Sequence, residues 1–215
     1  MMKEKSLLLF ILMSAFLILT LFVAKHVTRP FDLAVMQIVH DFTFTQLDYG
    51  LSFFTLLGSV EFSCFAVLVV CWYLYRKYSW SGAFLYLFFF VAISCFELIL
   101  KNFITYTSPG PEFDRNPFHW GVLAVSAPYS FPSGHTFRGA FLLGIWYERL
   151  SQRESIPIGS LLIQKIVIVL FMLAVGYSRI YLGHHWLSDV LGGYLLAAIA
   201  LALASQRPEH ELRPA

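Results

Sequence analysis

Residues 177–189 read Tyr-Ser-Arg-Ile-Tyr-Leu-Gly-His-His-Trp-Leu-Ser-Asp and separate two long apolar runs near the end of the chain. An arginine, a histidine pair and an aspartate are concentrated here, in a chain where such groups are scarce. His185 and Asp189 are four residues apart, so a helix would stack them on one face and the carboxylate would orient the imidazole. Because ionisable groups among membrane helices usually mark a functional site, we expect the chemistry to centre on this stretch.

The composition is that of a membrane protein. Hydrophobic residues make up 58% of the 215 residues, and charged residues make up only 13%. Runs of about 20 apolar residues span the hydrocarbon core of a bilayer, and they should be helical because lipid offers no partner to a free backbone group. Six such runs occur, at residues 6–24, 52–75, 82–100, 132–148, 161–178 and 185–205. The sequence predicts an all-α integral membrane bundle of six transmembrane helices, with its active site at one membrane face.

Little sequence remains for a second domain. We expect one membrane domain over residues 1–206 and a short polar tail over residues 207–215. The first apolar run lacks a cleavage pattern after it, which favours a retained helix over a secretory signal. The formal charge of +2 is too small to indicate nucleic-acid binding, so the expected partners are the lipid bilayer and a membrane substrate. The oligomeric state is not predicted.

The distribution of lysine and arginine predicts the orientation in the membrane. An amino terminus in the cytoplasm places these cations on the cytoplasmic side: Lys3, Lys5, Arg76, Lys77, Arg149, Arg153, Arg207 and Arg213. Six spans then return the carboxyl terminus to the same side. The opposite side also receives cations, but several of them cluster with histidines and indicate a site. We therefore expect cytoplasmic termini and an extracytoplasmic active site, in a membrane such as the bacterial inner membrane.

A second candidate segment opens the fourth apolar run. Residues 132–135 read Pro-Ser-Gly-His, which is ordinary chemistry for a helix start. The free amides and the positive dipole end of such a helix also suit a phosphate. Arg138 follows His135 by three residues and would lie on the same side of the helix. On the same membrane face, Lys101 ends the third run, with Glu97 as its local partner.

The sequence predicts the structure and role of two connecting stretches less specifically. Residues 26–50 suit either an amphipathic segment at the interface or a plain loop. Residues 102–131 form a long polar stretch interrupted by prolines, and loops of this length often cover a binding site.

The predicted topology brings three segments to one membrane face. They contribute Lys101, Ser133, Gly134, His135, Arg138, Arg179, His185 and Asp189. Cations and helix-end amides can hold a tetrahedral oxyanion, while histidines and an aspartate can perform nucleophilic and acid–base chemistry. This inventory indicates phosphoryl transfer.

On these residues the chain resembles the type 2 phosphatidic acid phosphatase (PAP2) family of membrane lipid phosphatases, over nearly its full length. Residues 132–135 match the second motif of that family in full. The third motif is matched by Ser178-Arg179 followed by His185 and Asp189 at the family's spacing.

The first motif of the family departs from its pattern in this chain. The pattern is a lysine, six residues, and then Arg-Pro; Lys101 and Pro109 are in register, but Ser108 stands in place of the arginine. Arg115, further along the same loop, and Arg138 are the two candidates for supplying the missing charge.

The resemblance implies a mechanism without a metal or cofactor. His185 would attack phosphorus and form a phosphohistidine while Asp189 holds its other ring nitrogen, and His135 would protonate the departing lipid oxygen and later activate water. The groups expected to bind the phosphate are Lys101, Ser133, the amide of Gly134 and Arg179. The implied substrate is a membrane lipid phosphate or pyrophosphate, such as phosphatidic acid, phosphatidylglycerol phosphate, a polyprenyl pyrophosphate or a lipid A phosphate. Two alternatives stay open: a lipid phosphotransferase that uses the same histidine, and a non-catalytic protein that binds or transports an anionic lipid.

Overall fold

The computed structural model describes residues 2–77, 80–118, 127–152 and 156–205. Within these ranges the chain contains helices and no β-strand, which confirms the predicted all-α class. The α-helices are α1 (Met2–Ala24), α2 (Arg29–Asp41), α3 (Thr45–Thr55), α4 (Val60–Lys77), α5 (Trp80–Phe103), α6 (Gly134–Ser151), α7 (Ile158–Tyr181) and α8 (Leu187–Ala204). Two short 3-10 helices are η1 (Leu56–Gly58) and η2 (Pro111–Phe113). The predicted tail, residues 207–215, lies outside the described ranges.

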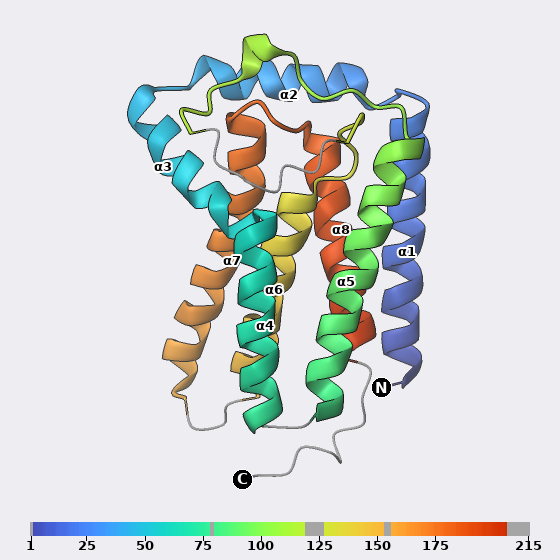
Figure 1. Cartoon of the computed structure of the whole chain (residues 1–215), viewed down its shortest axis with the longest axis vertical. Helices are drawn as coiled ribbons and strands as arrows, with labels where there is room; N and C mark the ends of the chain where they lie inside the picture. Colours follow the sequence, from blue (N-terminus) through green and yellow to red (C-terminus); the bar gives the residue numbers. More distant parts are fainter. Residues whose placement is uncertain (1, 78–79, 119–126, 153–155, 206–215) are drawn as a thin grey trace.

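The long helices lie side by side, and α2 lies across one end of the bundle (Figure 1). The central helix is α6, which packs against α4, α5, α7, α8 and η1. The first helix, α1, packs against α8. At the end of the bundle away from α2, Lys5 Nζ donates a hydrogen bond to the carbonyl of Ser205 at 3.4 Å. The start of α1 and the end of α8 therefore lie on one side, as an even number of passes requires.

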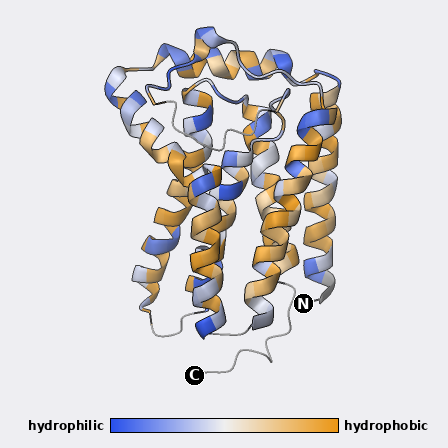
Figure 2. Cartoon of the chain, in the orientation of Figure 1, coloured by the Kyte–Doolittle hydropathy of each residue, from blue (hydrophilic) through white to orange (hydrophobic). Residues whose placement is uncertain are grey.

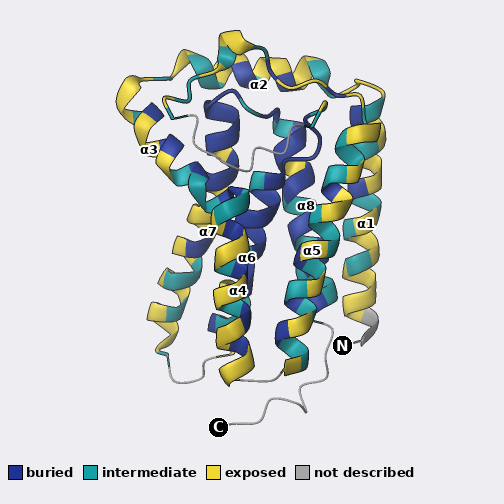
Figure 3. Cartoon of the chain, in the orientation of Figure 1, coloured by how far each residue is buried: buried dark blue, intermediate teal, exposed yellow. Residues whose placement is uncertain are grey.

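Four helices are long and apolar enough to cross a bilayer: α1, α5, α7 and α8. A fifth span is present if α3, η1 and α4 are taken together as one bent unit. Apolar residues dominate these helices (Figure 2), and many of their outward surfaces are exposed (Figure 3), as expected of faces that contact lipid. The protein is thus an integral membrane protein by this measure. Helix α6, which carries the fourth predicted run, is not among the candidates, so the number of six spans stays a prediction.

The second predicted run, residues 52–75, is corrected by the structure. It is not one straight helix, because η1 interrupts it and the chain turns by 51° between the two parts. Ser59 has extended backbone geometry, and its hydroxyl accepts a hydrogen bond from the amide of Phe62 at 3.3 Å, which begins α4 with an ordinary cap. The bend brings η1 against α6 near the candidate site.

Aromatic side chains fill the interface between α5 and α6. The ring of Phe90 lies 6.1 Å from that of Phe137 and 5.8 Å from that of Phe141. Both phenylalanines of α6 are fully buried. Because lipid is as apolar as these rings, close packing rather than transfer out of water holds the two helices together.

A buried carboxylate fastens α2 over the bundle. Asp32 is 1% exposed and accepts hydrogen bonds from the amide and the hydroxyl of Ser188, at 2.8 and 2.6 Å. It also accepts one from the hydroxyl of Tyr106 at 2.6 Å. Of the two possibilities for residues 26–50, the structure has helices α2 and α3 rather than a plain loop.

Candidate active site

The turn between α7 and α8 carries the histidine pair. Gly183 has a φ of +71°, in the left-handed region that favours glycine. The amides of His184 and His185 then donate to the carbonyl of Arg179, at 3.0 and 3.1 Å. This hydrogen-bonded turn fixes the backbone of both histidines immediately before α8 begins.

His185 is oriented by Asp189, as the four-residue spacing predicted. Its Nδ1 lies 3.1 Å from Asp189 Oδ2, and the aspartate side chain is fully buried in the first turn of α8. Burial, followed by the charges of Lys101 and Arg179, lowers the pKa of His185 well below its ordinary value. A neutral imidazole whose Nδ1–H points at a carboxylate leaves Nε2 with a free lone pair, which is the state that a nucleophile requires.

The amino end of α6 lies directly against this pair. Ser133 caps the helix, since its Oγ accepts from the amide of Thr136 at 3.4 Å. Its own amide donates to the carbonyl of Asp189 at 2.9 Å and so joins the two predicted motifs. His135 lines the cavity described below, whereas Ser133 and Gly134 are not among the lining residues.

Arg179 is buried and held by two partners. Its Nη1 donates to the hydroxyl of Thr55 at 2.7 Å, and its Nη2 donates to Nδ1 of His184 at 2.6 Å. Burial and the charge of Arg179 also lower the pKa of His184. His184 therefore serves here as a neutral acceptor for the guanidinium.

A second group of charges lies between α5 and α6. Lys101 Nζ is 2.9 Å from Glu97 Oε1, so the predicted local ion pair is present. The other oxygen of Glu97 is 3.5 Å from Arg138 Nη1. Arg138 Nε in turn donates to the carbonyl of Gly58 at 3.0 Å.

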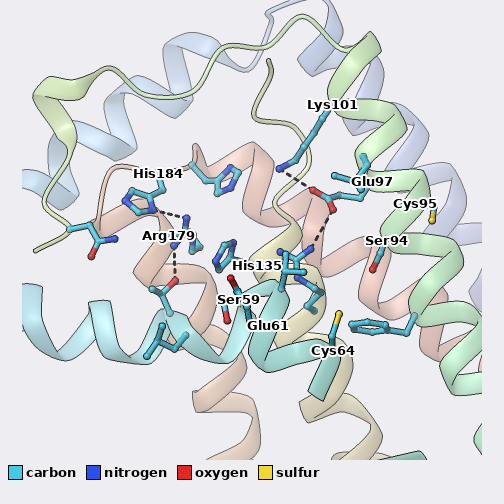
Figure 4. Close-up of a pocket in the computed structure, with 18 of the residues that line it drawn as sticks. Ser59, Glu61, Cys64, Ser94, Cys95, Glu97, Lys101, His135, Arg179 and His184 are labelled. Carbon is cyan, nitrogen blue, oxygen red and sulfur yellow. Dashed lines mark hydrogen bonds and ion pairs between the residues drawn. The ribbon is translucent and has the colours of Figure 1, made fainter. Parts of the chain in front are cut away.

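These groups surround one cavity of about 580 Å³. Figure 4 shows His135 between two sets of side chains, with Arg179 and His184 on one side and Lys101 and Glu97 on the other. The polar lining residues at the centre are Lys101, His135, Arg138, Arg179, His184 and His185. Cations on both sides of two histidines are suited to hold an anion where the histidines can react with it.

Arg115 is placed elsewhere. Its guanidinium forms a two-pronged ion pair with Asp48, at 3.1 and 2.8 Å, and it is not a lining residue. The structure thus brings together Lys101, His135, Arg138, Arg179 and His185, with Asp189 behind the last of them. Part of the predicted covering loop, residues 119–126, lies outside the described ranges. In the described part of the chain, no group of three or more His, Cys, Asp or Glu residues is arranged to hold a metal ion.

Sequence reasoning missed two partners of the site, Thr55 and the carbonyl of Gly58. Both come from the bend inside what looked like a continuous apolar run. The Gly58-Ser59 pair was the one available signal of a break there.

Residues 82–212, more than half of the chain, match the family model described as PAP2 superfamily. Phosphatidylglycerophosphatase B of Bacillus subtilis (strain 168) is 30% identical over 133 residues, and undecaprenyl-diphosphatase BcrC of the same strain is 34% identical over 119 residues. The alignments cover 61% and 54% of this chain, and 59% and 54% of those proteins. The chain thus spans somewhat more than half the length of the curated relatives it matches.

Two solved structures have a similar fold. The PAP2-type phosphatidylglycerolphosphate phosphatase of Bacillus subtilis matches with a TM-score of 0.74 and 23% identity, over 91% of this chain and 93% of that one. LpxE of Aquifex aeolicus matches with a TM-score of 0.58 and 21% identity, over 81% of this chain and 94% of that one. At these identities the likeness concerns the fold alone. With the family model covering most of the bundle, and both of its complete motifs meeting at one cavity, the chain belongs to the PAP2 superfamily.

Proposed function

We propose that this protein is a lipid phosphate phosphohydrolase that acts through a phosphohistidine and needs no metal ion. The observation that carries the proposal is the placement of His185, which lies 3.1 Å from Asp189 and faces a cavity shared with His135 and three cations. The names of the curated relatives, a phosphatidylglycerophosphatase and an undecaprenyl-diphosphatase, support the reaction class.

In the first step, Nε2 of His185 attacks phosphorus while the bond from phosphorus to the lipid oxygen breaks. His135 gives its proton to that oxygen, so the lipid leaves as an alcohol. Asp189 accepts the Nδ1–H of His185 and stabilises the positive charge that develops on the ring. The phosphate oxygens would be bound by Lys101, Arg179, Ser133 and the amide of Gly134.

In the second step, water attacks the phosphohistidine. His135, now neutral, accepts a proton from the water, and the bond between phosphorus and Nε2 breaks. Inorganic phosphate is released, and both histidines return to their starting states. Cations fixed around the phosphate stabilise the transition state because they need no reorganisation as charge develops.

The substrate class we propose is an amphiphile with a terminal phosphate or pyrophosphate. Beside the charged groups, the cavity has an apolar wall from η1, α4 and α5. The residues of this wall are Leu56, Val60, Phe90, Val91 and Leu98. An acyl or prenyl chain can lie against it while the phosphate meets the histidines. Phosphatidic acid, phosphatidylglycerol phosphate, a polyprenyl pyrophosphate and a lipid A phosphate all have this form.

The test is phosphate release by the purified protein in detergent with a chelator present, across those four lipids. We expect release by the unaltered protein and by Lys165→Ala, a cation near the start of α7, and none by His185→Ala. Acid-labile phosphate bound to the protein should appear during turnover and disappear in the variant. Release by His185→Ala at the normal rate would refute the mechanism. Transfer to an added alcohol, in place of release, would identify a phosphotransferase instead.

We propose that the site faces the extracytoplasmic side of a bacterial inner membrane and that both termini are cytoplasmic. The test uses a variant without native cysteines and with one cysteine introduced at an exposed position. Glu112→Cys should react with a reagent that cannot cross the membrane, whereas Gln152→Cys should react only with one that can. The reverse pattern would invert the orientation.

A further inference from the structure

Arg138 is a buried arginine that the proposed reaction does not yet use. It is 8% exposed, lines the cavity, and lies one helical turn below the start of α6. An arginine at such depth in a membrane bundle is costly unless partners meet its charge. Its neighbours are therefore informative about its role.

The partners of Arg138 hold it in place but do not use all of its donors. Nε donates a hydrogen bond to the carbonyl of Gly58 at 3.0 Å, and Glu97 Oε2 lies 3.5 Å from Nη1. Nη2 has no hydrogen bond to the described residues. A guanidinium with partners on one edge, and with donors on the other edge that have none, can donate those hydrogen bonds to an oxyanion.

The charges around Arg138 leave a positive excess. Glu97 carries one negative charge and is shared between Arg138 and Lys101. With Glu61 and Arg179 included, the described cavity lining contains three cations, Lys101, Arg138 and Arg179, and two carboxylates. A buried excess of one positive charge is favourable only when an anion or water compensates it.

The start of α6 is shaped to admit this group. A Cβ at Gly134 would lie 2.6 Å from Glu97 Oε1 and 2.8 Å from Arg138 Nη1. Any other residue there would force the end of one or both of these side chains to shift. The glycine that begins α6 thus makes room for the pair beside His135.

We infer that Arg138 is a substrate-binding cation of this site and that Glu97 is the positioning residue that directs both Arg138 and Lys101 at the phosphate. This inference rests on the proposed function and deepens it. It also accounts for Ser108, because the charge absent from the loop is supplied from α6. The carbonyl of the preceding residue, Thr107, accepts from the indole of Trp186 at 2.7 Å, so position 108 lies beside the turn that holds His185.

The first experiment measures KM and kcat with phosphatidic acid. Arg138→Ala should raise KM at least tenfold and change kcat less, whereas Arg138→Lys, which keeps the charge but not the planar fork, should raise it about threefold. Glu97→Gln keeps the shape of the side chain but loses the charge that holds two cations, and KM should rise severalfold. Lys165→Ala is the control and should match the unaltered protein. An Arg138→Ala variant with normal KM would overturn the inference.

The second experiment removes the positive charge at position 138 and places one at position 108. Adding Ser108→Arg to Arg138→Ala should return KM to within about threefold of the unaltered protein, because an arginine at position 108, beside the turn that holds His185, restores the lost positive charge. A merely structural arginine would not be replaced from a different element. Failure of Ser108→Arg to lower KM, in a double variant that melts normally, would contradict the inference.

A binding measurement separates this inference from the hydrolase proposal. Thermal stabilisation by phosphatidic acid is measured in His185→Ala, where no turnover is expected, with and without Arg138→Ala. We expect the second change to weaken binding at least tenfold even if the unaltered protein releases no phosphate. If the unaltered protein released phosphate normally and Arg138→Ala left the binding of phosphatidic acid unchanged, the inference would be refuted and the hydrolase proposal would stand.

Discussion

Replacement of Asp32 tests how α2 is attached to α8. Its carboxylate is buried and accepts from the amide and hydroxyl of Ser188, in the first turn of α8, and from the hydroxyl of Tyr106. Asp32→Ala leaves at least two buried donors without acceptors, and each costs about 1–3 kcal/mol. Relief of the desolvated carboxylate offsets part of this loss. We expect the free energy of unfolding to fall by about 3 kcal/mol, or about 6–12 °C in Tm for a chain of this length.

The assay is thermal unfolding in detergent, with Asp41→Ala as the matched control. Asp41 ends the same helix and is exposed, so its removal should change Tm by less than about 2 °C. Asp32→Asn should fall between the two, because an amide oxygen still accepts from Ser188 but carries no charge. If Asp32→Ala melted at the same temperature as Asp41→Ala, the network would not fasten α2, and the argument from buried donors would be wrong.

Three further predictions concern the site itself. Asp189→Asn should lower kcat by about 30- to 1000-fold, equivalent to about 2–4 kcal/mol for one charge-assisted hydrogen bond, and leave KM within twofold, as steady-state kinetics would show. Because burial and nearby cations lower the pKa of His185, its neutral form persists below pH 6.5, so the acid-side fall in kcat/KM should lie lower than that; Lys101→Ala should move it to higher pH, and an unmoved profile would count against the assignment. Cys64 and Cys95 line the cavity, so phosphatidic acid should slow their labelling by a thiol reagent, as mass spectrometry would detect.

The parts of the site that sequence predicted are those set by local spacing. His185 and Asp189 are four positions apart, as are Glu97 and Lys101; this spacing defines contacts within one helix or one turn, and both contacts are present. The cap at Ser133 follows from the same local chemistry. Such contacts depend on helical periodicity, which is visible in a sequence without knowledge of the fold.

The parts that sequence did not predict depend on where distant elements meet. Arg115 was a candidate because it lies on the loop after Lys101, but Asp48 of α3 binds it away from the cavity. Thr55 and Gly58 became partners of Arg179 and Arg138 because a bend places η1 against α6. Helical periodicity in the sequence does not predict these contacts, because they arise from the packing of separate helices.

The low hydropathy of α6 and the polar residues that it brings to the cavity have the same physical cause. A helix that faces lipid must be apolar on its outer surface, but α6 is surrounded by α4, α5, α7 and α8. Its neighbours can therefore supply polar partners at depth, and Glu97 and the carbonyl of Gly58 do so for Arg138. The enclosed position allows α6 to carry His135 and Arg138 into the bundle, where the low dielectric would strengthen their interaction with the proposed phosphate. Low hydropathy in a helix at the centre of a membrane bundle is thus itself an indication of the active site.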